Sequence, residues 1–340
     1  MATLPAIIDI EKNMIKKAGD IIRPMNLGNK CLIVTGVNTK KIAGQKLYNE
    51  LKKEYETDII IGVSNEKKEL ESFAKNVEPY NFLVGVGGGK IMDITKYSAH
   101  LTGKPWISFP TVLSHDGIVS SRASLSDNGT KTSINAKEPR AILADYDILK
   151  EAPIRWMISG AADLISNYSA VEDWRLASSA EQEKYSELCA GLSLTAANAC
   201  VADMKDIIRK NYNGVRTLLE ALVLSGFAMN LFGSSRPASG SEHNFAHALE
   251  MMNAPGLHGE QCGIGTIISS YLQKKNWVKI KEHLKNFGAP TKASDIKITD
   301  EQAIEALVQA PKIRTRYTIL DRYDIDRKMA KQILETVGVI

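Results

Sequence analysis

The order of strand-like and helix-like segments between residues 30 and 111 is the strongest constraint on the fold of this chain. Short apolar runs at 30–36, 58–63, 81–89 and 104–111 alternate with amphipathic segments at 39–55, 65–77 and 90–101. Apolar runs of this length are typical of strands buried on both faces of a sheet. The alternation therefore predicts a parallel sheet with right-handed helical crossovers, in an α/β fold.

The chain after residue 117 has a different character. β-branched residues and turn signals at 127–129 and 137–139 predict a hairpin, followed by a last strand at 141–145. After Pro153 the pattern is helical almost to the end, with Ala-rich segments at 156–180, 181–209 and 215–233. We predict two domains, an α/β domain at 1–150 and an all-helical domain at 151–340.

Charge and composition argue against several classes of protein. The net charge of +4 over 340 residues is small, and the lysines are scattered, which gives little support for nucleic-acid binding. The four cysteines form no CxxC pair and indicate reduced thiols in a cytosolic protein. The N-terminus lacks the pattern of a signal peptide, and no run of about 18 apolar residues occurs. We expect a cytoplasmic protein that does not span a membrane.

Three consecutive glycines, Gly87, Gly88 and Gly89, lie between a predicted strand and a predicted helix. Glycines let a ligand approach the main chain closely, and the free N–H groups at a helix start favour a phosphate. The familiar motifs do not fit, because GxGxxG would need glycine at Lys90 and a Walker loop would need Ser or Thr at Ile91. The turn is either a pyrophosphate cradle or a tight connection without a ligand.

A polar loop at 108–121 follows the fourth predicted strand and should emerge at the same sheet edge as the glycines. Ligands bind at the carboxyl ends of strands in open α/β sheets. A catalytic triad at 114–116 is rejected, because adjacent residues cannot easily converge as nucleophile, base and orienting group. The loop is instead predicted to bind a ligand through hydroxyls and a carboxylate from Thr111, Ser114, Asp116 and Ser120.

Three of the six histidines, His243, His247 and His258, lie within sixteen residues. The spacing of four places the first two on one helical face. Both could bind one metal, or one could bind it while the other meets a substrate. Pro255 and Gly256 should end the helix, so that His258 lies on the next turn or helix start and can fold back toward His243.

A catalytic metal usually needs three protein ligands and an open position. Asp163 is a candidate ligand on another predicted helix, because a carboxylate among the small residues 160–162 would need a partner if that helix is buried. Two simpler explanations stay open at this point. Asp163 could be an early-helix charge favoured by the helix dipole, and the paired histidines could lie on a polar face without any function.

Five motifs in fixed order carry a resemblance to a known family. They are VGVGGGKIMD (84–93), FPTVLSHDG (109–117), GAADLISN (160–167), SEHNFAHALE (241–250) and LHGEQCG (257–263). Over nearly its whole length the chain resembles the superfamily of iron-containing alcohol dehydrogenases, glycerol dehydrogenases and dehydroquinate synthases. Within it, the chain most resembles the archaeal sn-glycerol-1-phosphate dehydrogenases.

The resemblance implies a dehydroquinate synthase-like fold, with a Rossmann-like dinucleotide-binding domain, a helical metal- and substrate-binding domain, and the active site between them. It implies that Asp163, His243 and His258 hold the metal. It also implies substrate contacts from Asp116, Asp163 and His247, with Asp116 and His247 in catalytic roles. The implied cofactor-binding residues are Gly87, Gly88, Gly89, Lys90, Ile91, Thr111, Ser114 and Ser120.

The implied activity is reduction of dihydroxyacetone phosphate to sn-glycerol 1-phosphate, which supplies the backbone of archaeal ether lipids. The expected cofactors are NADP(H) or NAD(H) and one Zn²⁺, with Fe²⁺ possible. Asp163 favours the dehydrogenase branch, because dehydroquinate synthases carry Glu there. The stretch Asn38-Thr39-Lys40-Lys41 contains no acid to hold the ribose of NAD, so it permits NADPH.

Alternatives are a plain glycerol dehydrogenase, a dehydroquinate-synthase-like cyclase, and a nucleotide-sensing scaffold without a metal. Homo-oligomerisation is also expected. Lys131, Lys137 and Arg140 are considered as ligands of the substrate phosphate because they follow the polar loop in the sequence.

Overall fold

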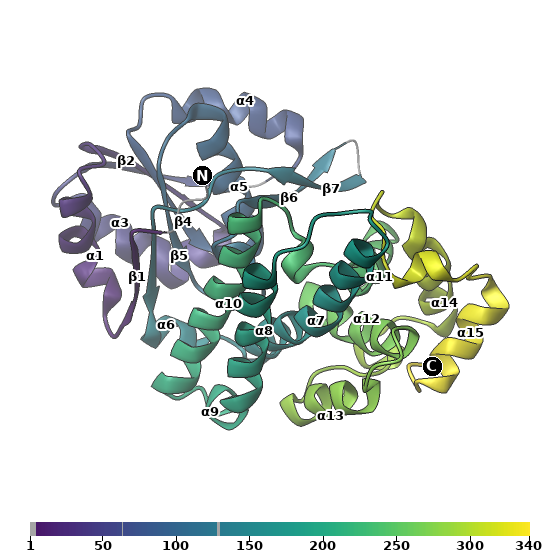
Figure 1. The fold of residues 1–340 in the computed structure, drawn as a ribbon. Coiled ribbons are helices and arrows are strands. Elements are labelled where there is room, and N and C mark those ends of the chain that lie inside the picture. Colours follow the sequence, from purple (N-terminus) through teal and green to yellow (C-terminus); the bar gives the residue numbers. More distant parts are fainter. Residues whose placement is uncertain (1–4, 63, 128–129) are drawn as a thin grey trace.

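Six parallel strands form the central sheet of the N-terminal half (Figure 1). The structure is a computed structural model that describes residues 5–62, 64–127 and 130–340. In sheet order the strands are β1 (Ile7–Glu11), β8 (Ala141–Asp145), β5 (Trp106–Pro110), β4 (Phe82–Gly87), β2 (Lys30–Thr35) and β3 (Glu56–Ile61). The predicted parallel sheet is confirmed. The sequence pattern did not predict β1, a short edge strand that, among the described residues, pairs with the distant β8 and buries one of its side chains.

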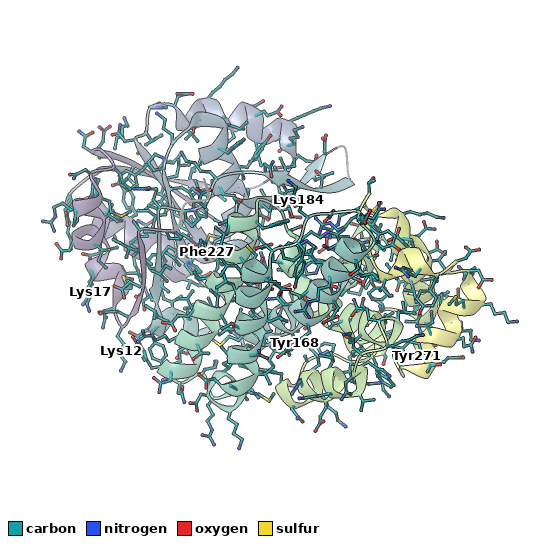
Figure 2. All side chains as sticks on the ribbon, viewed as in Figure 1. Lys12, Lys17, Tyr168, Lys184, Phe227 and Tyr271 are labelled. Carbon is teal, nitrogen blue, oxygen red and sulfur yellow. The ribbon has the colours of Figure 1, made fainter. Side chains whose placement is uncertain are left out.

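Helices cover both faces of the sheet, because successive side chains of a strand point to opposite sides. Ile33 packs with α1 (Met14–Ile22) and α3 (Gln45–Leu51), whereas its neighbours Leu32 and Val34 face α4 (Lys67–Val77) and α5 (Gly89–Thr102). Helix α1 buries Met14 against the sheet and exposes Lys17 at the periphery (Figure 2). The single helix predicted at 39–55 is instead α2 (Val37–Thr39), a π-helical turn Lys40–Gly44, and α3.

The predicted hairpin is present as β6 (Arg122–Asp127) and β7 (Thr130–Asn135), which pair antiparallel in a separate two-stranded sheet. Residues 128 and 129 of its predicted turn lie outside the described residues. The hairpin leaves the parallel sheet and reaches the helical half, where β7 contacts α11 (Ser241–Met251). It therefore forms one wall of the region between the two halves.

The described residues after 145 form helices and connecting segments. The remaining helices are α6 (Tyr146–Glu151), α7 (Ile154–Ser179), α8 (Glu187–Ala202), α9 (Met204–Ile208), α10 (Tyr212–Phe232), α12 (His258–Leu272), α13 (Trp277–Phe287), α14 (Asp300–Gln309) and α15 (Arg327–Thr336). Among the described helices, α10 alone has the length and apolar composition of a membrane span. The protein buries 61% of an 18-residue stretch of this helix, and a core helix can have the same length and composition.

Small residues let α7 lie unusually close to its neighbours. A Cβ on Gly160 would overlap the backbone oxygen of Leu113, which lies in the loop after β5. A Cβ on Gly259 of α12 would overlap the backbone oxygen of Ser159 on α7. Because these two glycines flank the positions of Asp163 and His258, the close approach brings both side chains into one small region.

Replacing Gly259 with alanine is expected to lower the free energy of unfolding by about 1–3 kcal/mol, because the added methyl group overpacks a rigid backbone contact. Chemical denaturation measures the change. The matched control is Gly191→Ala on the exposed side of α8, where nothing lies within 4 Å of the added carbon. It should gain up to about 1 kcal/mol from helix propensity. Equal stability of Gly259→Ala and the parent would contradict the close packing.

Candidate metal centre and cofactor cleft

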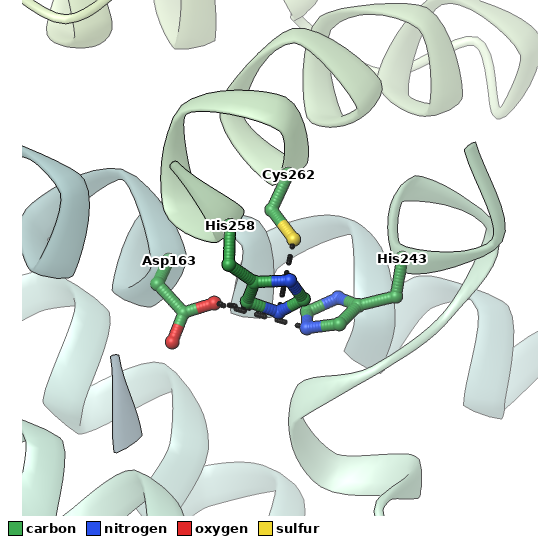
Figure 3. A group of neighbouring side chains, drawn as sticks. All are labelled: Asp163, His243, His258 and Cys262. Atoms are coloured by element: carbon green, nitrogen blue, oxygen red, sulfur yellow. Dashed lines mark hydrogen bonds and ion pairs between the residues drawn. The ribbon is translucent and has the colours of Figure 1, made fainter. Parts of the chain in front are cut away.

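Three helices bring four potential metal ligands together (Figure 3). Asp163 comes from α7, His243 from α11, and His258 and Cys262 from successive turns of α12. One ligand atom from each residue lies within 4.8 Å of the others. The Nε2 atoms of His243 and His258 lie 3.7 and 3.9 Å from Oδ1 of Asp163. The Sγ atom of Cys262 lies 3.5 Å from Nε2 of His258.

The environment of Asp163 fits a cation. Its Oδ1 atom is buried and has no hydrogen-bond partner among the described residues. A buried carboxylate oxygen without a partner is costly, and a metal ion between it and the two imidazoles would remove that cost. Two histidines and a carboxylate suit Zn²⁺ or Fe²⁺. Burial raises the pKa of the Cys262 thiol to about 12, so this residue is an ordinary thiol unless a cation is bound.

Outer carboxylates orient the two imidazoles of the group. Nδ1 of His243 lies 2.8 Å from Oε1 of Glu242, and Nδ1 of His258 lies 3.1 Å from Oε1 of Glu250. Because the carboxylates engage Nδ1, Nε2 is left to face the centre of the group. Burial, helped by His258, lowers the pKa of His243 to about 3, so this ring is neutral and ready to bind a metal.

The protonation of His258 differs from that of His243. Burial opposes a charge on this ring, but Cys262 and Glu250 together raise its pKa well above the ordinary value. A metal ion bound at Nε2 of this ring would displace any proton there, as metal binding commonly does.

His247 lies one turn after His243 on α11 and lines a cavity of about 360 Å³ that His243 and His258 also line. Its Nδ1 atom lies 3.0 Å from Oε2 of Glu250, so Nε2 is the nitrogen available to a ligand in the cavity. Burial, followed by the charge of Arg314, lowers the pKa of His247 to about 3. Glu250 therefore holds two rings at once, one in the metal-binding group and one beside it.

Asp116 ties the loop after β5 to the helical half. Its backbone N–H donates to Oδ2 of Asp163 at 3.2 Å, and its carboxylate accepts from Oγ of Ser225 on α10 at 3.0 Å. Burial, followed by the negative charge of Asp163, raises the pKa of Asp116 to about 7. His115 makes a different contact, in which its Nδ1 atom accepts from the N–H of Gly117. The residues at 114–116 thus have separate partners, consistent with the rejection of a triad.

A buried lysine holds the same loop from the other side. Lys96 on α5 is fully buried, and its Nζ donates to the backbone oxygens of Gly117, Ser120 and Arg122 at 2.5, 3.1 and 2.9 Å. Asp93 lies 3.4 Å away and balances its charge. Desolvation by burial lowers the pKa of Lys96, and the three carbonyl oxygens and Asp93 compensate for its lost hydration. The loop beside the metal-binding group is therefore fixed in position.

A cleft of about 850 Å³ runs from the carboxyl edge of the sheet to the metal-binding group. Gly88 and Gly89, at the start of α5, lie at one side of it, with Lys41 and Lys46 in the segment after β2. His258 lines its inner end. A cleft of this shape, with free N–H groups at the start of a 14-residue helix, suits an elongated ligand that carries phosphate groups.

Comparisons with known proteins agree with this architecture. Residues 9–153 match the family model of the iron-containing alcohol dehydrogenases. The chain is 44% identical to the glycerol-1-phosphate dehydrogenase (NAD(P)+) of Pyrococcus abyssi, over 99% of this chain and 98% of that protein. The corresponding protein of Pyrococcus horikoshii is also 44% identical, over the same shares of each chain.

The chain belongs to the glycerol-1-phosphate dehydrogenase family. Its fold is also that of a solved structure, a probable glycerol dehydrogenase from Sinorhizobium meliloti. The two share 20% sequence identity with a TM-score of 0.79, over 99% of this chain and 97% of the other. The predicted family and fold class are both confirmed.

Most of the cofactor-binding residues inferred from the family resemblance line the large cleft. They are Gly88, Gly89, Lys90, Ile91, Thr111 and Ser114. Gly87 ends β4 beneath the turn, where a side chain would collide with Ile91. Ser120 lines the smaller cavity, together with Asp116 and His247. The roles of all these residues remain predictions.

The sequence patterns did not reveal the residues that support the metal-binding group. Glu250 follows His247 by three residues, and Cys262 follows His258 by four, so helical spacing could have indicated both. Glu260 lies in the motif LHGEQCG, but no role for it could be predicted from that motif. Its carboxylate accepts from the backbone N–H of Leu257 and from Arg155, and so fixes the start of α12 and thereby His258.

Replacing Asp163 with asparagine is expected to abolish metal retention, because the amide oxygen carries no charge to balance the cation. Elemental analysis of protein purified with Zn²⁺ or Fe²⁺ measures the loss, and His243→Ala should behave in the same way. The control is His247→Ala, which should keep the metal and lose activity, since its ring lines the cavity but does not belong to the cluster of potential ligand atoms. Loss of metal from His247→Ala would show that this ring is a ligand.

Proposed function

We propose that the chain is a metal-dependent oxidoreductase that reduces dihydroxyacetone phosphate to sn-glycerol 1-phosphate with NADPH, and with NADH less well. The proposal rests on the observation that two cavities meet. Gly89, Lys90, His115 and His258 line both the large cleft and the small cavity that contains His243 and His247. A nicotinamide in the cleft and a small ketone in the cavity would therefore be neighbours. The names of the full-length relatives support the same activity.

The chain's residues would divide the work of ketone reduction. When bound, the metal supplies Lewis acidity and the nicotinamide cofactor supplies hydride. Asp163, His243 and His258 hold the metal, and the N-terminus of α5 holds the cofactor pyrophosphate. His247, held by Glu250 through Nδ1, presents Nε2 as a hydrogen-bond acceptor that orients the substrate and the water that brings the proton to the new hydroxyl group. Asp116, fixed by Ser225, orients the substrate from the loop after β5, which also lines the cavity.

The preference for NADPH rests on the residues after β2. Asn38, Thr39, Lys41 and Lys46 line the cleft, and no acid follows β2 directly. An acid at this place usually binds the ribose of NAD, whereas cationic side chains accommodate the 2′-phosphate of NADP.

We also propose that the enzyme acts in the cytoplasm as a homo-oligomer, with domains at 1–150 and 151–340. The four cysteines are buried and unpaired, which suits a reducing compartment. All six strands of the parallel sheet end before residue 146, which supports the proposed boundary.

The metal-loaded enzyme is expected to reduce dihydroxyacetone phosphate with a kcat/KM at least about 100-fold above that for dihydroxyacetone, since binding of a phosphate dianion contributes to the transition state. Steady-state oxidation of NADPH with each ketone measures the ratio. Equal rates would favour a plain glycerol dehydrogenase. Release of phosphate from a sugar-acid phosphate without net NADPH consumption would favour a cyclase.

Replacing Lys41 and Lys46 together with alanine is expected to raise the KM for NADPH by about tenfold, because charge-assisted contacts to the 2′-phosphate are lost. The KM for NADH should change little. Lys16→Ala, an exposed position on α1, is the control for general surface charge. An equal rise in KM for both cofactors would contradict the assignment.

A further inference from the structure

Arg314 has a buried guanidinium group with an unsatisfied hydrogen-bond donor. It lies between α14 and α15, and its Nη1 donates to Oγ of Ser239 at 3.1 Å. Its Nη2 atom is buried and has no hydrogen-bond partner among the described residues. No carboxylate of the described chain lies within ion-pair distance of this guanidinium. A buried charged donor in this state is costly to the fold, which points to a ligand that it serves.

The position of Arg314 connects it to the proposed active site. Arg314 lines the small cavity together with His243, His247 and His258. The nearest acidic groups are already engaged. Glu242 accepts from Gly240 and Ser169 and lies against His243, and Glu250 holds two imidazoles.

Arg122 lies across the cavity from the helical half, on β6. The small cavity and an adjoining cavity of about 630 Å³ share Arg122, Ser133, Ser235 and Arg314 in their linings. The Arg122 guanidinium is oriented by the hairpin itself, through the backbone oxygen of Ser133 at 2.7 Å and through Asn135. Two arginines from opposite halves of the chain therefore line the same end of the cavity.

The guanidinium groups of Arg122 and Arg314 indicate what kind of ligand this end of the cavity would bind. Planar guanidinium groups recognise carboxylate and phosphate oxygens, and a phosphate has enough acceptor oxygens to meet donors from two sides. The histidines lie in the same small cavity, so a short molecule with a carbonyl near one end and a phosphate at the other would reach both.

We propose that Arg314 donates from Nη2 to the substrate phosphate, and that Arg122 completes the phosphate site from the facing hairpin; this assignment rests on the proposed function. It replaces the candidates suggested by sequence proximity. Lys137 donates to the backbone oxygen of Gly103, and neither it nor Arg140 lines either cavity. The side chain of Lys131 lies outside the described part of the structure.

The test is Arg314→Gln, assayed as metal-loaded enzyme with both ketones. We expect kcat/KM for dihydroxyacetone phosphate to fall about 10- to 100-fold, as loss of a charge-assisted hydrogen bond predicts, and kcat/KM for dihydroxyacetone to fall by a clearly smaller factor, because that ketone has no phosphate for Arg314 to bind. Calorimetric titration of the variant with dihydroxyacetone phosphate should show weaker binding by a similar factor. Arg314→Lys keeps the charge and should recover part of the loss.

Lys312→Gln is the matched control, since Lys312 is exposed and lines only the outer of the two cavities. It should retain the parent preference for the phosphorylated ketone. The assignment is overturned if Arg314→Gln and Arg314→Lys lose kcat/KM equally with both ketones. It is also overturned if Arg314→Gln keeps the parent preference. If the parent enzyme itself shows no preference, the proposed substrate is wrong and the phosphate site falls with it. If the parent enzyme prefers the phosphorylated ketone and Arg314→Gln keeps that preference, only the role of Arg314 is wrong and the proposed substrate stands.

Discussion

The close contact between α7 and α12 is the constraint on which the site depends. Gly160 and Gly259 remove the side chains that would hold α7 away from the loop after β5 and from the start of α12. The contact places Oδ1 of Asp163 in a buried position where two imidazoles, but no hydrogen-bond donor among the described residues, face it. The fold thus retains a buried carboxylate oxygen without a hydrogen bond. A cation bound there would compensate for the energetic cost of burying it.

The rest of the site is arranged around that oxygen. Glu242 and Glu250 engage the Nδ1 atoms of the histidines, so the opposite nitrogens point inward. Lys96 fixes the loop that carries Asp116, and the same loop forms a wall between the cofactor cleft and the smaller cavity. The parallel sheet contributes the carboxyl edge at which a dinucleotide would lie, and the helical half contributes the ligands and the phosphate-binding arginine.

The sequence predicts those features of the fold and site that depend on residues close together in the chain. Buried parallel strands have short apolar runs, and the helical spacing of His243 and His247 predicted one shared face, as found on α11. The division of labour between these two rings was not determined by spacing, because it depends on which of them faces Asp163 across three helices. Strand β1 and Arg314 gave no usable signal, since each acquires its role from residues more than 60 positions away in the sequence.

The central claim is that Asp163, His243 and His258 bind one metal ion while His247 faces the substrate. The most direct measurement is anomalous diffraction at the absorption edge of the metal present in crystals of the purified enzyme. We expect a single strong peak between Oδ1 of Asp163 and the Nε2 atoms of the two histidines. A peak within bonding distance of Nε2 of His247, or the absence of a peak within bonding distance of Asp163, would contradict this assignment of ligands.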